Sequence, residues 1–172
     1  IGNHGALGGK SRRNYNPETN ADRMLYKIVE MAYEGNERIN FNIPDGDRER
    51  NWYTVADLGE KCKFFLFHGD QVRGFGGFPW YGFGKKLLGW KALAANGLME
   101  DFDYACAGHY HTPTTMYVND IRLWVNGSTE SYNTFAQEQL ASMGRTCQYL
   151  LFANNGLGVT SEYLINLELE NK

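Results

Sequence analysis

The sequence predicts an α+β or α/β fold in which a mixed β-sheet sandwich is flanked by helices. Three observations lead to this class. Short apolar runs typical of strands outnumber stretches with helical spacing, helices fall between several strands, and turn residues separate the elements. The chain has 172 residues, of which 42% are hydrophobic and 15% aromatic, enough for one domain with a core. We therefore expect a single domain over residues 1–172.

Short apolar or alternating runs bounded by Gly, Pro, Asn or Asp indicate the strands. The expected strands cover residues 39–43, 52–58, 63–67, 104–107, 116–118, 122–125, 147–152 and 159–167. Turn chemistry at 44–47 separates the first two, and Asn119-Asp120 and 154–156 predict hairpins. The continuous apolar run at 63–67 suits a strand that is buried on both faces.

Helical spacing of apolar residues predicts three helices. The first spans residues 20–34, with Asn20 as N-cap, and its apolar side is expected to pack against a sheet. The second follows a loop at 74–84 that is rich in glycine and aromatic residues. A brief third helix is expected at 133–142.

The composition excludes several classes of protein. A net charge of -3 and a pI near 5.8 argue against a broad basic surface, so any contact with nucleic acid would be local. The longest apolar stretches, 64–67 and 149–153, are far shorter than the roughly 20 residues that cross a bilayer, so no membrane association is expected. Cys62, Cys106 and Cys147 have the wide spacing of free core thiols in a reducing compartment. We expect a cytoplasmic protein.

The four histidines stand beside or close to glycine at the expected ends of strands. They occur as Gly2-Asn3-His4, His68-Gly69 and Gly108-His109-Tyr110-His111. Imidazole is a common ligand of divalent metals near neutral pH, and an amide oxygen adds a harder ligand. Glycine lets the backbone approach an ion or a phosphate, and ligands tend to bind at strand ends. A lone histidine at a strand end is more often a structural residue than a ligand, so the residues alone leave a metal site and separate structural histidines both open.

The histidine motifs resemble those of the calcineurin-like metallophosphoesterases. The family signature runs Asp-x-His, Gly-Asp, Gly-Asn-His, a lone His after a strand, and Gly-His-x-His. Residues 2–4, His68 and residues 108–111 match the last three elements in order, and residues 125–128 resemble the small-residue strand end that often follows. The resemblance covers nearly the whole chain.

The resemblance implies a fold and a mechanism. The fold would be the C-terminal part of a four-layer αββα domain. Asn3, His68 and His109 would ligate one metal ion and His111 a second, while His4 would bind phosphate and protonate or orient the leaving group. The two ions would activate a hydroxide for attack on a phosphomonoester or phosphodiester. Manganese is the expected metal, and iron, zinc and nickel are compatible with the ligands.

Two departures from the family pattern limit what this chain can do. The family usually has Glu or Asp after Gly-Asn-His, where this chain has Gly5. The Asp-x-His and Gly-Asp elements are absent, and the chain begins at Ile1 without an initiator Met. We expect a missing N-terminal segment or subunit to supply these ligands. This chain alone would bind at most one metal tightly and have little or no activity.

Other residues have both a functional and a structural interpretation. Lys10, Arg12 and Arg13 either bind substrate phosphates or form a solvated loop. Tyr110 either faces the substrate or points to the core. Asp70 is expected to be a turn residue rather than a ligand. The aromatic loop from Phe75 to Phe83 either stacks bases, caps the active site or plugs the core.

Three hypotheses about function follow. The first is a metal-dependent hydrolase of phosphate esters, in which a nuclease role would make nucleic acid the substrate. The second is a non-catalytic structural or regulatory module derived from half of a phosphoesterase. The third is an unrelated sandwich with a structural zinc held by His68, His109 and His111.

Overall fold

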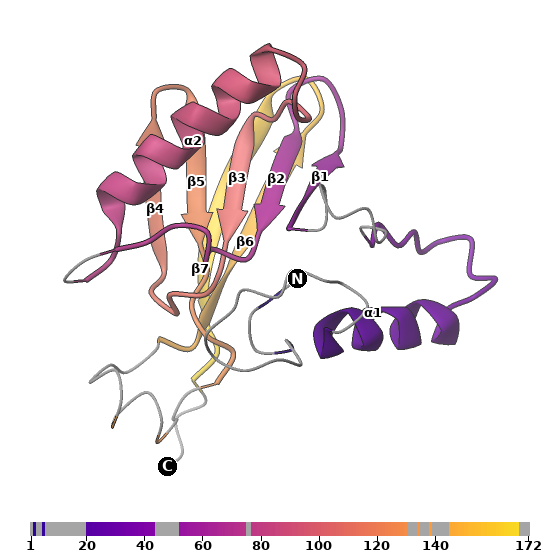
Figure 1. The fold of residues 1–172 in the computed structure, drawn as a ribbon. Helices are drawn as coiled ribbons and strands as arrows, with labels where there is room; N and C mark the ends of the chain where they lie inside the picture. The colour runs from indigo at the N-terminus through magenta and orange to yellow at the C-terminus, as the bar shows by residue number, and fades with distance from the viewer. Residues whose placement is uncertain are drawn as a thin grey trace.

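The computed structural model describes most of the chain (Figure 1). The described residues are 2, 5, 20–43, 52–74, 77–130, 134, 138 and 145–168. The expected turn at 44–47 lies outside them, as does the expected helix at 133–142 except for Thr134 and Glu138, which are helical. Within the described ranges, no helix is long and apolar enough to span a membrane.

A mixed five-stranded sheet forms the centre of the molecule. Its strands are β1 (Tyr53–Asp57), β2 (Lys63–Phe67), β3 (Tyr104–Ala107), β4 (Thr114–Val118) and β5 (Ile121–Val125). They lie in the order β1-β2-β3-β5-β4, with β2, β3 and β5 parallel and the two edge strands antiparallel to their neighbours. The predicted mixed sheet flanked by helices is therefore confirmed.

Helix α2 (Trp80–Ala95) covers one face of this sheet (Figure 1). It connects the parallel strands β2 and β3, which need such a crossover because no tight turn can join them. Its buried residues Phe83, Leu87 and Trp90 pack on the strand side chains of that face. Phe65 is fully buried here, and its ring stacks on Phe102 with centroids 4.8 Å apart.

A two-stranded sheet of β6 (Cys147–Asn154) and β7 (Gly158–Asn166) packs on the other face. Phe64 and Trp124 of the central sheet meet Tyr149 and Leu151 of β6 in this second core. Both faces of β2 are covered, as its continuous apolar sequence predicted. The result is a helix and two sheets in three layers.

The outer face of the β6–β7 sheet carries apolar side chains that the described residues do not cover. The register pairs Leu150 with Tyr163 and places Phe152 and Ile165 on the same side of the sheet. All four side chains are exposed. A larger than usual apolar surface therefore remains open on this side.

Helix α1 (Ala21–Ala32) begins where the sequence predicted but does not pack as expected. The Asn20 side chain accepts hydrogen bonds from the backbone N–H groups of Asp22 and Arg23, and Gly35 follows the helix with φ of 82°. None of the helix residues is buried, and Met31 is 71% exposed. The expected packing of its apolar side against a sheet is thus wrong.

Two other expectations needed correction. Residues 39–43 alternate in sequence but form no strand, because no neighbouring strand pairs with them in the described part of the chain. Helix α2 begins at Trp80, inside the stretch at 74–84 that was expected to be loop. The remaining strands lie within a few residues of their expected positions, and both predicted hairpins are present.

An ionic cluster joins the two sheets and should be important for stability. The Glu162 carboxylate of β7 accepts hydrogen bonds of 2.6 Å from Arg122 Nη2 and from the indole Nε1 of the buried Trp124. Replacement Glu162→Ala leaves the indole N–H without this partner, which should lower the free energy of unfolding by about 2 kcal/mol. Urea denaturation measures the change.

The exposed Glu60 provides the control, because Glu60→Ala removes a carboxylate that takes part in no ion pair among the described residues. Its unfolding midpoint should match that of the unmodified protein. Equal midpoints for the two variants would show that the inter-sheet cluster adds nothing to stability.

Candidate metal centre

The parallel pairing of β2 and β3 brings His68 and His109 together. Leu66 pairs with Cys106, and the pairing continues past the strands, where the Gly108 N–H donates to the His68 carbonyl at 2.9 Å. His68 directly follows β2 and His109 is the second residue after β3. The Nε2 atom of His68 and the Nδ1 atom of His109 are 3.1 Å apart.

Gly69 permits this close approach of the two strand ends. Its φ is 119°, a conformation that side chains disfavour. A Cβ added at Gly69 would lie 3.1 Å from both the Gly108 carbonyl oxygen and the His109 Cβ atom. The Gly69 N–H also donates to the Gln71 side-chain oxygen at 3.1 Å, which fixes the start of the loop. The His68–His109 pair therefore depends on a glycine at this position.

His109 and His111 have a left-handed backbone, with φ of 64° and 51°. Such a conformation costs roughly 1–2 kcal/mol for a residue with a side chain, and it clusters at functional sites. Tyr110 anchors the segment between them. Its hydroxyl donates to the Val72 carbonyl, and its ring packs at centroid distances of 5.4 Å from Phe78 and 5.7 Å from Phe83.

These contacts decide between the two interpretations of Tyr110. The side chain is directed into the core, so the contacts favour the core interpretation over the expected contact with substrate. Phe78 and Phe83 of the aromatic loop also pack in the core, which matches the plug interpretation for these two rings. Asp70 lies in the turn after His68, as expected.

A hollow of about 550 Å³ opens beside the histidines. His68, His109 and His111 form part of its wall. The other part comes from the ends of β5 and β6 and the loop after β5, and it includes Asn126, Gly127, Ser128, Glu130 and Gln148. These polar groups, which could contact a phosphate or a hydrated ion, share the wall with apolar residues such as Leu66 and Phe67. We call it the polar hollow.

The described residues near the N-terminus approach the same histidines. A Cβ added at Gly2 would lie 3.5 Å from the Cε1 and Nδ1 atoms of His68. The Asn20 side chain donates to the Gly2 carbonyl at 3.0 Å, and the Ala21 N–H donates to the Gly5 carbonyl at 2.6 Å. The residues on either side of Asn3-His4 are thus held at the start of α1, and Gly2 lies against His68.

The predicted site residues fall into two groups. Asn3, His4, Arg12 and Arg13 lie outside the described residues, as does Lys10. Of the others, His68 and His109 are in contact, and His111 lies on the wall of the same hollow. Within the described ranges, no three His, Cys, Asp or Glu side chains are grouped to hold a metal ion.

The facing histidine nitrogens fit the geometry of a shared cation. Two imidazole nitrogens bound to one tetrahedral ion at about 2.0–2.1 Å are about 3.3 Å apart, close to the observed 3.1 Å. Only one of the two facing atoms can carry a proton, because two N–H groups would point at each other. A cation in place of that proton is therefore compatible with the positions of the two imidazole rings.

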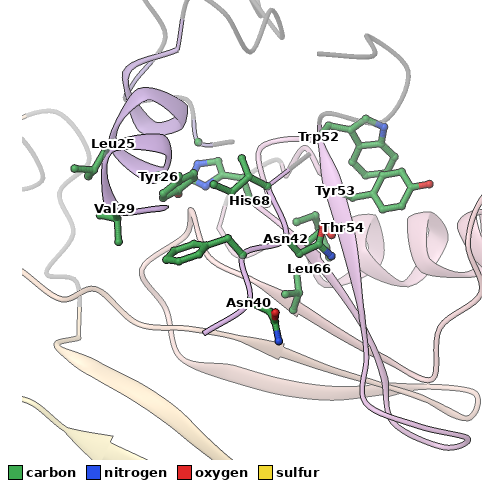
Figure 2. Close-up of a pocket in the computed structure, with 14 residues that line it drawn as sticks. Leu25, Tyr26, Val29, Asn40, Asn42, Trp52, Tyr53, Thr54, Leu66 and His68 are labelled. Atoms are coloured by element: carbon green, nitrogen blue, oxygen red, sulfur yellow. The ribbon is translucent and has the colours of Figure 1, made fainter. Parts of the chain in front are cut away.

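A second, more apolar pocket of about 660 Å³ lies between α1 and the sheet, with His68 on its wall (Figure 2). Leu25, Tyr26 and Val29 of α1 line it on one side, and Leu66 of β2 lines it on the other. The segment at 39–43 contributes Asn40, Phe41, Asn42 and Ile43. His68 thus contributes to two hollows, one polar and one apolar.

Some residues of the site were missed by reasoning from the sequence. Asn126 directly follows β5, the parallel neighbour of β3, so the strand-end rule that identified His68 would also have found it. Its side-chain oxygen accepts from the Tyr149 N–H at 2.9 Å and so ties the two sheets together. Gln148 reaches the hollow from the second sheet, and no feature of its local sequence indicates this.

Comparisons with known proteins find distant similarity in structure. No protein-family model and no curated protein sequence matches the chain. Vps29 from Entamoeba histolytica in complex with Zn²⁺ has a TM-score of 0.46 and 18% identity, covering 76% of this chain and 67% of that one. Vps29 from Cryptosporidium parvum has a TM-score of 0.42 and 17% identity, and the match covers 82% of this chain and 76% of that one. A predicted phosphoesterase from Streptococcus pneumoniae has a TM-score of 0.37 and 14% identity, and the match covers 83% of this chain and 90% of that one. All three are too distant to carry an argument about activity.

Gly69→Ala should disrupt the histidine pair. The added methyl group meets Gly108 and His109, and the positive φ is unfavourable for alanine, so the free energy of unfolding should fall by about 1–3 kcal/mol. Thermal denaturation measures the loss.

Gly84→Ala is the matched control, because a Cβ at this α2 glycine meets nothing within 4 Å. It should stabilise the helix by about 0.5–1 kcal/mol. A Gly69→Ala protein as stable as the Gly84→Ala protein would contradict the close approach described above.

Cys106 lines the hollow but should not react as a thiolate. Burial raises the pKa of its thiol to about 12, so the neutral form dominates near pH 8, whereas an unfolded cysteine has a pKa of about 8.5. Alkylation by iodoacetamide should therefore be much slower in the native protein than in urea. Mass spectrometry of the peptide that contains Cys106 measures both rates, and equal rates would contradict the prediction.

Proposed function

We propose that this protein hydrolyses phosphate esters with a metal centre built on His68 and His109. The observation that carries the proposal is the 3.1 Å separation of their ring nitrogens at adjacent ends of parallel strands. The order of the histidine motifs and the polar hollow beside the pair support it. His68, His109 and an oxygen ligand from Asn3 would hold one ion, and His111 would contribute to a second.

Bound divalent ions would supply electrostatic stabilisation of the phosphoryl oxygens and a nucleophile derived from water. The chain's own residues would position the substrate. His4 would donate a proton to the leaving oxygen or orient it, and the position of Gly2, two residues before it, close to His68 supports this role. Asn126 and Ser128 would border the phosphate on the opposite wall of the hollow.

The described residues form only part of such a centre. A catalytic metal usually has three protein ligands and an open position, and the described residues bring no three metal-binding groups of the His, Cys, Asp and Glu type together. We propose that carboxylate ligands come from a further segment of the parent protein or from a separate subunit. The chain alone would then bind a single ion and show little activity.

The two hollows beside His68 suggest the kind of ester. The polar hollow suits a phosphate, and the apolar pocket next to it is lined by rings and aliphatic side chains from α1 and the sheet. An ester with a planar or apolar leaving group, such as a nucleoside, would place each part in a matching environment. A nuclease or nucleotide phosphodiesterase fits this description, with manganese as the first metal to test.

A non-catalytic module is the second candidate. The lack of a three-ligand group among the described residues favours it, because a protein that only binds a partner needs no complete metal centre. The two candidates differ in whether adding the missing ligands produces hydrolysis.

Metal binding by the chain itself is the first test. Isothermal titration with Mn²⁺ and Zn²⁺ should show one site, and His68→Ala and His109→Ala should each weaken it by about a hundredfold or more, since each variant removes a ligand. Glu60→Ala, which lies outside the hollow, should bind as the unmodified protein does. Unchanged affinity in both histidine variants would exclude the proposed centre.

Activity is the second test. The full parent protein, or the chain combined with its complementary subunit, should hydrolyse a bis-aryl phosphodiester with Mn²⁺, and His109→Ala should reduce kcat by at least about a hundredfold. Metal binding without hydrolysis in the complete protein would leave the non-catalytic module as the better account.

A further inference from the structure

A second groove, separate from the histidine site, lies along helix α2. It has a volume of about 760 Å³, which is within the range of pockets that hold small ligands. Its walls come from the loop after β2 and from the side of α2, and they include Gln71, Arg73, Tyr81, Lys85, Lys86 and Trp90. Of these residues, Tyr81 belongs to the aromatic stretch at 74–84 for which base stacking is one interpretation, and none of the others is part of the candidate metal centre.

The groove concentrates positive charge in an acidic protein. Arg73, Lys85 and Lys86 line it, and no Asp or Glu does, although the chain has 20 acidic and 17 basic residues. None of these three cations forms an ion pair with a carboxylate in the described part of the chain. The first turn of α2 also lacks an acidic residue, so nothing there offsets the positive end of the helix dipole. An anion is the ligand that this charge distribution favours.

The groove also offers rings and a donor. Tyr81 is 82% exposed at its edge, so its ring is accessible to a ligand. The Lys86 ammonium lies 5.8 Å from the centre of the Trp90 ring, which keeps its charge beside the groove. The Gln71 Nε2 atom is buried and has no hydrogen-bond partner among the described residues. Gln71 therefore carries a donor that no described residue uses.

Two glycines keep the groove open. Gly82 and Gly89 stand seven residues apart on the same side of α2, on either side of the two lysines. A Cβ at Gly82 would lie 2.9 Å from the Arg73 carbonyl oxygen, so this glycine also lets the Arg73 segment pack on the helix. A Cβ at Gly89 meets nothing within 4 Å. The space above Gly89 is therefore free for a ligand.

We propose that this groove binds a nucleotide, with its phosphate against Arg73, Lys85 and Lys86 and its base against Tyr81. Phosphate requires several cationic donors, and a base stacks on an aromatic ring and accepts hydrogen bonds from an amide. The nucleotide is either free or one unit of a nucleic-acid strand. The proposal depends on the groove alone and not on the metal centre.

The groove lies close to the histidines along the chain. Gln71 lines it and accepts the hydrogen bond from Gly69, the residue after His68. One loop therefore carries a metal-site histidine at its start and a groove residue three positions later.

The test measures binding of AMP, adenosine and inorganic phosphate by isothermal titration at low ionic strength with EDTA, so that no metal contributes. AMP should bind more tightly than adenosine or phosphate, because only AMP engages both the cations and the ring. Arg73→Ala, Lys85→Ala and Lys86→Ala should each weaken AMP binding by about tenfold. Tyr81→Ala should weaken it by about tenfold and Tyr81→Phe should not.

Three controls separate the groove from general charge and from the metal site. Lys61→Ala removes an equal charge on an exposed loop that does not line the groove, and it should leave AMP binding unchanged. Gly89→Leu should block the groove without changing its charge. His109→Ala should bind AMP normally, so a failure of the metal proposal would not affect this one. Circular dichroism checks that each variant is folded.

A short thymidine oligonucleotide distinguishes the two sources of nucleotide. If it displaces AMP and binds much more tightly, the groove holds a strand, and if it binds no better, the groove holds a free nucleotide. Either result supports the proposal. AMP binding that is absent, that persists in Gly89→Leu, or that falls as much in Lys61→Ala as in Lys86→Ala would overturn it.

Discussion

The parallel pairing of β2 with β3 is the constraint on which the rest of the structure depends. Two parallel neighbours end at the same edge of the sheet, so residues that follow them meet even when 41 positions separate His68 from His109. The same pairing requires a long crossover, which supplies α2 and the core beneath it. The candidate site and the hydrophobic core on the α2 face thus have one geometric origin.

Much of this arrangement could be predicted from local sequence. The strands at 63–67 and 104–107 are short apolar runs that end in glycine and histidine, and their burial and their termini follow from that pattern. Each of His68 and His109 follows a strand, as the local pattern predicts, but their meeting also needs the parallel pairing of β2 with β3, which no local pattern indicates. The capping of α1 by Asn20 was equally local, because one side chain satisfies the first free N–H groups.

The expectations that were wrong have a common physical cause. Each concerned a feature that depends on residues distant in the sequence. Residues 39–43 have the alternation of a strand, but a strand also needs a neighbour, and instead four of them line the apolar pocket beside α1. The apolar side of α1 has the right spacing to be buried, yet nothing among the described residues covers it. Gln148 reaches the hollow only because the second sheet packs against the first.

The surroundings of His68 combine three environments within one loop. The polar hollow, the apolar pocket and the basic groove all contact residues between 66 and 73. The net charge is negative and argues only against a broad basic surface, so it does not indicate this local group of cations. For recognition of a ligand, the local grouping of cationic side chains matters more than the net charge of the chain.

The left-handed backbone at His109 and His111 has a consequence for how this protein tolerates mutation. Glycine or asparagine at either position would relax the main chain and make the folded state more stable, while removing an imidazole from the hollow. Selection for stability alone would therefore replace both histidines. On the proposed function, the strained main chain holds these imidazoles beside the hollow at some loss of stability, and variants selected for stability without an activity requirement should lose these side chains early.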